Sequence, residues 1–166
     1  MKVFYFINTK VQQKYRPLLF LIIAILLSVQ KTSAQSEEQI KAMFIFKFPQ
    51  YFEWPDKDFD FFTIGIFSED SALYDEFEIL AEQNLIKNKP VKLKVFASLS
   101  EITRTHILYV HKDTYANINR ILEKISGSEC LLITEIAEYN KSMINFVIVN
   151  NSLKFEMNEK LIAQEG

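Results

Sequence analysis

Apolar residues recur along residues 37–53 at the spacing of an amphipathic helix with one face in a core. Ser36, followed by two glutamates, is typical of a helix N-terminus. Pro49 should kink this helix, because it lacks the N–H that the preceding turn needs and its ring crowds that turn. The proline after Trp54 disfavours helical backbone there, so we expect the helix to end at about Glu53. The apolar positions that define the pattern are Ile40, Met43, Phe44, Phe48, Tyr51 and Phe52.

Beyond residue 60 the chain alternates short apolar runs with segments of helix length. Apolar strands separated by helices are typical of a mostly parallel sheet that is covered on both faces. The pattern predicts strands at 61–67, 91–97, 105–110 and 130–134, and helices at 72–83 and 115–125.

The last two apolar runs, 143–149 and 153–157, are joined by Asn150-Asn151-Ser152. Asparagine tolerates the left-handed backbone of a tight turn, so these runs predict an antiparallel hairpin. A short helix begins at Glu159. The predicted fold class is α/β: a single domain with a mostly parallel sheet, flanking helices and a C-terminal antiparallel hairpin.

The first 34 residues have the pattern of a secretory signal peptide. Four basic residues precede an apolar run, Leu18 to Val29, and no acidic residue occurs before Glu37. That run is shorter than the roughly 20 residues of a spanning helix, and small residues end at Ala34. We therefore expect a cleaved signal peptide at 1–34, a periplasmic domain at 35–166 and no membrane insertion after cleavage. An uncleaved amphipathic anchor is the alternative.

Charge and cysteine usage restrict the function further. Five of the 19 basic residues lie in the predicted signal peptide, which leaves 14 against 21 acidic residues in the mature chain. An acidic surface argues against nucleic-acid binding and against an anionic membrane face. Cys130 is the only cysteine, so an intramolecular disulfide is excluded. Its apolar neighbours predict burial in the core, with a disulfide-linked dimer as the alternative.

The residues that carry most enzyme chemistry are absent or badly spaced. Three glycines are too few for a phosphate-binding loop. His106 and His111 bracket one strand at an odd separation, so they should point to opposite faces and share no metal. We expect His106 in the core and His111 near a ligand at the carboxyl end of the strand. Without a nucleophile or metal motif, the sequence predicts no metal, no cofactor and no enzyme.

The segment KFPQYFEWP, residues 47–55, contains the only tryptophan of the chain. Aromatic side chains bury enough area to anchor a helix, so Phe44 and Phe48 should hold it on the sheet. Ile45 and Phe46 fall off the main apolar face and are expected to contribute to a surface for a partner.

Two candidate sites follow from these elements. The exit of the first helix is predicted to be an exposed partner surface, because the acidic loop at 56–60 keeps this edge in solvent. The carboxyl ends of the parallel strands are the usual ligand position in an open α/β sheet. The partner surface consists of Glu53, Trp54 and Pro55, and the ligand pocket of Ser68, His111 and Glu135.

Five segments in order carry a family resemblance: IKAMFIFKFPQYFEWP, FFTIGIF, THILYV, CLLITE and MINFVIVNNSLKFEMN. Together they resemble the YfiR/HmsC-like family of exported bacterial regulators, in which an aromatic helix ends in a similar Trp-Pro signature. The resemblance runs from about Ile40 to the C-terminus. It implies a periplasmic α/β domain without catalytic activity that represses a membrane-bound diguanylate cyclase by contacting its periplasmic part. Such contact would control cyclic di-GMP and biofilm formation.

The resemblance also implies a tendency to form a homodimer, and a histidine kinase is the alternative membrane partner. Some members carry paired cysteines, one of them where this chain has Thr105, so redox sensing through internal disulfides is not expected here. Members usually continue beyond the position of Gly166, so we expect a shortened last helix. Two other function classes remain open: a periplasmic small-ligand sensor that uses the predicted pocket, and a secreted hydrolase.

Overall fold

A computed structural model describes residues 35–54, 58–69, 72–112, 114, 118–136 and 141–165. The predicted signal peptide, Pro55 and part of the acidic loop lie outside these described residues.

The first helix, α2, spans Glu37–Lys47 and is followed by a short 3₁₀ helix, η1, at Phe48–Tyr51. Its start is as predicted: the Gln39 backbone N–H donates to Ser36 Oγ at 3.1 Å, and the Ser36 N–H donates to Gln39 Oε1 at 3.1 Å. This reciprocal pair satisfies two N–H groups that a helix start leaves open. The α-helix ends at Lys47 and not near Glu53, because Pro49 cannot donate to the turn before it.

Every strand and helix expected after residue 60 is present, with small differences in its bounds. The strands are β1 (Phe62–Phe67), β2 (Leu85–Ile86), β3 (Lys89–Phe96), β4 (Ile107–Val110), β5 (Leu131–Thr134), β6 (Ile144–Val149) and β7 (Ser152–Met157). The helices are α3 (Ala72–Gln83), α4 (Ile118–Ile125) and α5 (Glu159–Glu165), with a 3₁₀ turn, η2, at Leu99–Glu101.

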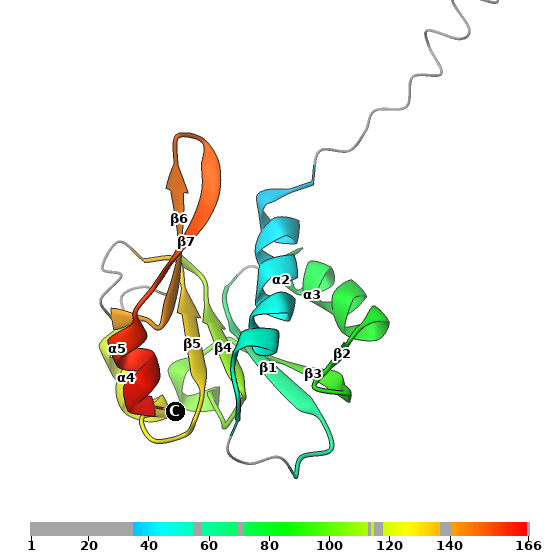
Figure 1. Cartoon of the computed structure of the whole chain (residues 1–166), viewed down its shortest axis with the longest axis vertical. Coiled ribbons are helices and arrows are strands. Elements are labelled where there is room, and N and C mark those ends of the chain that lie inside the picture. The colour runs from blue at the N-terminus through cyan, green and yellow to red at the C-terminus, as the bar shows by residue number, and fades with distance from the viewer. Residues whose placement is uncertain are drawn as a thin grey trace, which may run out of the picture. The chain divides into compact units, whose positions relative to one another are not determined.

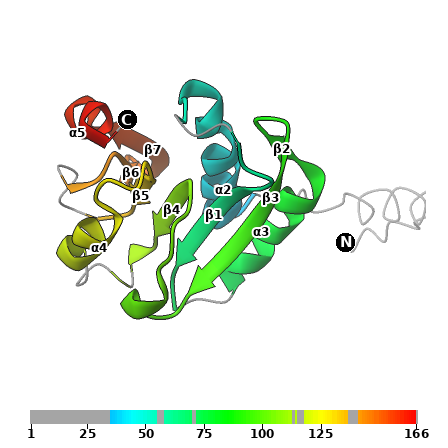
Figure 2. The same cartoon turned by 90° about the horizontal axis from the view of Figure 1, so that it is seen from below.

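The described strands form one seven-stranded sheet in the order β2-β3-β1-β4-β5-β6-β7. The five central strands pair in parallel, and the pairs β2–β3 and β6–β7 are antiparallel. The predicted α/β class, with its mostly parallel sheet and its C-terminal hairpin, is confirmed. Helices α2 and α3 lie together beside β1 and β3, whereas α4 and α5 lie toward the β5–β7 end (Figures 1 and 2).

Two tight turns have left-handed backbone at their central residues. Asn150 and Asn151 have φ values of 52° and 57°, so the predicted β6–β7 turn uses left-handed backbone that asparagine tolerates. Lys87 and Asn88, with φ values of 52° and 62°, form a similar turn between β2 and β3. The sequence analysis missed that hairpin, since β2 has only two residues.

The apolar face of α2 is broader than its spacing predicts. Ile45 and Phe46 are buried, which corrects the expectation that they lie on a partner surface, and Met43 is exposed. The reason is that α2 has neighbours on several sides. The Phe46 ring lies 6.1 Å from that of Phe77 in α3, and the Phe48 ring lies 5.1 Å from that of Phe155 in β7. Phe48 is a core residue, as predicted.

None of the described helices has both the length and the apolar character needed to cross a membrane.

Candidate functional site

A buried lysine lies where α2 crosses the carboxyl ends of the central strands. The Lys41 side chain is 1% exposed, and its ammonium lies 2.6 Å from Glu37 Oε1 and 3.2 Å from Glu38 Oε1 on the same helix. It also donates to Glu135 Oε2 at 2.6 Å, across 94 residues of sequence. Tyr109 of β4 donates its hydroxyl proton to Glu135 Oε1. One ammonium therefore holds the first helix to the residue that follows β5.

The charges in this cluster do not balance, because three carboxylates surround one ammonium. Burial raises the pKa of the Glu135 carboxyl to about 6, and the hydrogen bond and charge of Lys41 offset this only in part. Burial opposes the charged form of Lys41, but the hydrogen bonds that its ammonium donates to Glu135 and Glu37 outweigh this effect and raise the pKa of the ammonium. The lysine thus stays charged, whereas the anionic form of Glu135, the most buried of the three carboxylates, is destabilised.

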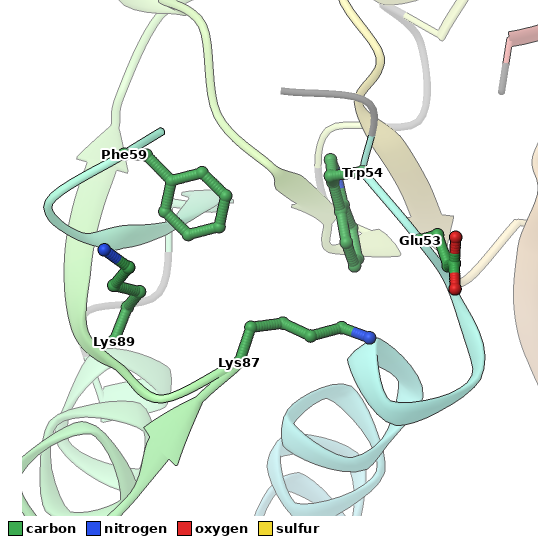
Figure 3. A pocket seen from close by; sticks show the side chains of 5 residues that line it. All are labelled: Glu53, Trp54, Phe59, Lys87 and Lys89. Atoms are coloured by element: carbon green, nitrogen blue, oxygen red, sulfur yellow. The ribbon is translucent and has the colours of Figure 1, made fainter. Parts of the chain in front are cut away.

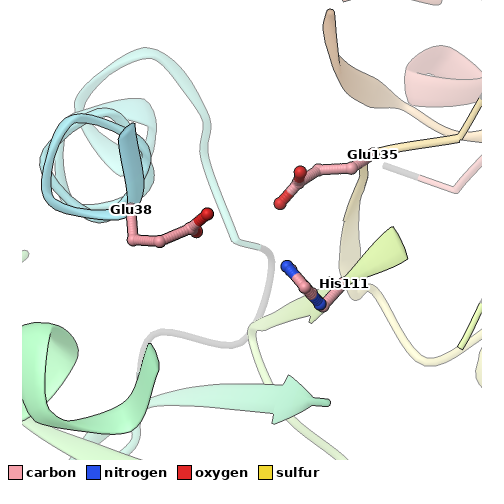
Figure 4. Close-up of side chains that lie close together, drawn as sticks. All are labelled: Glu38, His111 and Glu135. Atoms are coloured by element: carbon pink, nitrogen blue, oxygen red, sulfur yellow. The ribbon is translucent and has the colours of Figure 1, made fainter. Parts of the chain in front are cut away.

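His111 lies beside this cluster at the end of β4. Its backbone N–H donates to the Phe67 carbonyl at 3.0 Å, which continues the pairing of β4 with β1. One ligand atom each from Glu38, His111 and Glu135 lies within 4.8 Å of the other two. Figure 4 shows the three side chains pointing toward one another from α2, from the end of β4 and from the end of β5.

The structure brings together two of the three residues predicted for the ligand pocket. His111 and Glu135 meet, and Ser68 is buried directly after β1, the strand beside β4. The position is the one predicted, at the carboxyl ends of adjacent parallel strands. Its character differs, because α2 covers these ends and fills the space with Lys41 and its carboxylates. That the site binds a ligand stays a prediction.

Sequence reasoning missed Glu38, Lys41 and Tyr109. Lys41 lies between the apolar positions of the helical pattern and lysine is almost never fully buried unless it is paired, so the pattern alone favours an exposed position for it. A usable signal was present in the spacing: Glu37 and Glu38 precede Lys41 by four and three residues, the separation at which side chains on a helix meet.

The predicted partner surface lies at the opposite, amino-terminal end of the central strands. Trp54 is 8% exposed, so the expectation of an exposed tryptophan is wrong. Its Nε1–H donates to the Glu129 carbonyl at 3.1 Å, and its ring meets that of Phe62 edge-on at 4.9 Å. The predicted change of backbone at the helix exit has turned the tryptophan inward. Glu53 is exposed, and Tyr51, which is 80% exposed, is the outward aromatic of this stretch.

A cavity of about 240 Å³ opens beside Trp54. Trp54 and Phe59 form two aromatic walls, and Lys87 and Lys89 come from the β2–β3 hairpin (Figure 3). Glu53 completes the lining. We call the surface formed by Tyr51 and these five residues the exit surface; it combines aromatic area with charges of both signs.

The two histidines lie at opposite ends of β4. His106 stacks on Phe62 with ring centroids 4.6 Å apart, and its Nδ1 accepts a hydrogen bond of 2.9 Å from the Thr63 N–H. His106 is thus a partly buried, hydrogen-bonded packing residue, in line with the predicted core role. His111 at the far end belongs to the ionic cluster. The prediction that the pair shares no metal agrees with this separation and awaits measurement.

Cys130 is buried, as expected for a core residue, and its Sγ lies 3.6 Å from Thr105 Oγ1. A disulfide between two chains would require a conformational change to expose this thiol.

Comparison with known proteins places the chain in a family. No curated protein matches it. The family model described as YfiR/HmsC-like matches residues 38–166, which include almost all of α2 and every later element. The chain therefore belongs to the YfiR/HmsC-like family.

Proposed function

We propose that this protein is a periplasmic regulator that represses a membrane-bound diguanylate cyclase by binding the cyclase's periplasmic part. Membership of the YfiR/HmsC-like family is consistent with this role and is the observation that carries the proposal. The signal-peptide pattern of residues 1–34 supports export, and an acidic mature chain suits a partner other than nucleic acid. In this role the protein acts through contact, and its effect is a change in cyclic di-GMP and in biofilm formation.

The exit surface is the part of the fold that we assign to the partner. Tyr51 is a large aromatic side chain that is almost fully exposed, and exposed aromatic residues of this kind are enriched among interface hot spots. The cavity at Trp54 and Phe59, which begins two residues after Tyr51 in the sequence with Glu53, offers a recess for an apolar or aromatic side chain of the partner. Glu53, Lys87 and Lys89 supply charges that would select among partners. Pro55, predicted for the same surface, lies outside the described residues and keeps its place as a prediction.

The test is a complementation experiment in the source bacterium. Deletion of the gene should raise cyclic di-GMP and biofilm mass, and the wild-type gene should lower both. Tyr51→Ala should lose repression, because truncating an interface aromatic costs about 2 kcal/mol or more, equivalent to roughly 30-fold in affinity. Ile79→Ala is the matched control, since Ile79 is an exposed apolar residue of α3 that is not part of the exit surface.

The outcomes separate the parts of the proposal. Unchanged cyclic di-GMP in the deletion strain would contradict the cyclase assignment, and a phosphorylation defect of a membrane kinase in that strain would favour the histidine kinase as the partner. Full repression by a stable Tyr51→Ala protein would move the contact away from the exit surface.

We also propose that the protein forms a homodimer. The edge strand β7 is the part of the fold that we expect at the dimer interface. β7 ends the sheet, so one side of its backbone has no neighbouring strand in the described sheet. Phe155 and Met157 of β7 are partly exposed. Open edges of this kind pair readily with a second copy. Sedimentation of the mature protein should show a dimer that Met157→Lys dissociates; a wild-type monomer at every concentration would contradict it.

A further inference from the structure

The cluster below α2 contains a set of side chains that suits a metal ion. Glu38, His111 and Glu135 each place one ligand atom within 4.8 Å of the others. They come from three separate elements that the fold, and not local sequence, brings together (Figure 4). Imidazole nitrogen and carboxylate oxygen are both zinc ligands, and zinc sites with three protein ligands keep a further position for water.

Two observations distinguish this group from an ordinary patch of acidic residues. It is largely inside the protein: the Glu135 side chain is 8% exposed and His111 is buried. In addition, Glu38 Oε2 is buried and accepts no hydrogen bond from the described residues. A buried carboxylate oxygen without a hydrogen-bond donor destabilises the fold. A cation at this position would give that oxygen a partner.

The charge of the cluster points the same way. Glu37, Glu38 and Glu135 share the ammonium of Lys41, so the groups in these three ion pairs carry two more negative than positive charges, and the charge of Lys112 also acts on Glu37. A divalent cation would neutralise that excess.

Lys41 leaves room for this role because it engages one oxygen of each glutamate. Its ammonium meets Glu38 Oε1 and Glu135 Oε2, and the other oxygens are Glu38 Oε2 and the acceptor of the Tyr109 hydroxyl proton. Partners of this kind orient ligands in metal sites without touching the ion. His111, at the end of β4, also borders the topological switch point, where β3 and β4 leave β1 in opposite directions and open α/β sheets bind ligands.

We propose that Glu38, His111 and Glu135 bind one divalent transition-metal ion, and that this ion fastens α2 to the carboxyl ends of β4 and β5. Zinc is the ion with which we test the proposal. Imidazole selects against calcium and magnesium, which prefer oxygen ligands alone. The proposal concerns a structural or sensory ion and does not depend on the regulatory role proposed above.

The experiment is a zinc titration of the mature protein without a histidine tag, after treatment with a chelator. We expect one zinc per chain, retained through gel filtration, and a melting temperature that rises with zinc. Loss of an outer-shell partner alone typically costs about 10- to 100-fold in metal affinity, so Glu38→Gln should weaken zinc binding at least about 10-fold. His111→Gln should do the same, and Co²⁺ in place of zinc should show a visible spectrum that changes in that variant.

Glu82→Gln is the matched control, because Glu82 is an exposed glutamate of α3 outside the cluster, and it should bind zinc like the wild type. Glu38 is partly exposed, so Glu38→Gln gives a folded variant even if His111→Gln does not fold. Absence of stoichiometric zinc in the wild type overturns the proposal, as does equal zinc affinity in the wild type and in Glu38→Gln. Calcium binding at equal affinity would overturn the assignment to a transition metal.

Discussion

Replacing Lys41 by methionine tests how much the buried ionic cluster contributes to stability. The Glu135 carboxyl has a pKa of about 6 instead of 4.5, so its burial as an anion already costs about 2 kcal/mol at neutral pH, at 1.36 kcal/mol per pKa unit. Without the ammonium the carboxyl should stay protonated at pH 7.5, which costs about 4 kcal/mol relative to a free carboxyl. The difference is about 2 kcal/mol.

The pairs with Glu37 and Glu38 are more exposed and should contribute less than about 1 kcal/mol in total. We therefore expect Lys41→Met to lower the free energy of unfolding by about 2 to 3 kcal/mol at pH 7.5, slightly below the usual cost of breaking a buried pair. Methionine keeps the apolar part of the side chain, so packing should change little.

The pH dependence of this loss provides a stricter test. A carboxyl whose pKa is raised by folding favours the folded state at low pH, and this contribution is lost as the pH rises from 4.5 through the folded pKa. In the wild type the loss ends near pH 6, whereas in Lys41→Met it should continue to higher pH because the pKa of Glu135 rises further. The two proteins should therefore differ little at pH 5 and most above pH 7.

The measurement is urea unfolding at pH 5 and pH 7.5, in the presence of a chelator, followed by the fluorescence of Trp54, the only tryptophan. Lys47→Met is the matched control, since Lys47 lies on the same helix and is exposed, and it should change stability by less than about 0.5 kcal/mol. A loss of that size for Lys41→Met, or a larger loss that is equal at both pH values, would refute the reasoning.

Three further predictions concern other parts of the chain. Trp54→Ala should cost about 3 to 5 kcal/mol, as much as Phe48→Ala, because both side chains are buried; chemical denaturation of the two variants measures this, and a much smaller loss for Trp54→Ala would contradict the burial. Gly65→Ala should cost about 1 to 3 kcal/mol, seen as a lower melting temperature, because a Cβ there would lie 2.7 Å from the Phe96 ring; an unchanged melting temperature would show that the ring moves freely. The exported protein should begin at Gln35, and N-terminal sequencing that finds Met1 would contradict the predicted cleavage.

The strands and the class of fold were predictable because they depend on local pattern. β4 is apolar at every position and β5 at every position but Thr134, and both strands are buried throughout, as central parallel strands must be. The β6–β7 turn was predictable because asparagine is one of the few residues that accepts its backbone. The two-residue strand β2 was not, since a run of that length has no periodicity and its turn begins with a lysine.

The orientation of α2 could not be derived from its own residues. Bulky apolar side chains occur on almost every side of this helix, so spacing alone did not decide which side faces the sheet. The choice depends on neighbours distant in sequence: Phe77 of α3 covers Phe46, and Phe155 of β7 covers Phe48. The same limit explains Trp54, whose inward position follows from a carbonyl at Glu129 that accepts its N–H.

The buried position of Lys41 follows from the same geometry. Ile45 lies four residues further along α2 and faces the core, so Lys41 shares its side of the helix. A buried lysine at this position is stable only if its ammonium pairs with a carboxylate. That carboxylate belongs to Glu135, the residue directly after β5. Neither α2 nor the end of β5 predicts this ion pair by itself, because Lys41 and Glu135 are 94 residues apart in the sequence. Glu135 was predicted as a site residue because it follows the carboxyl end of a parallel strand, where α/β sheets usually bind ligands. This rule located the cluster, but it does not indicate that the first helix supplies part of it.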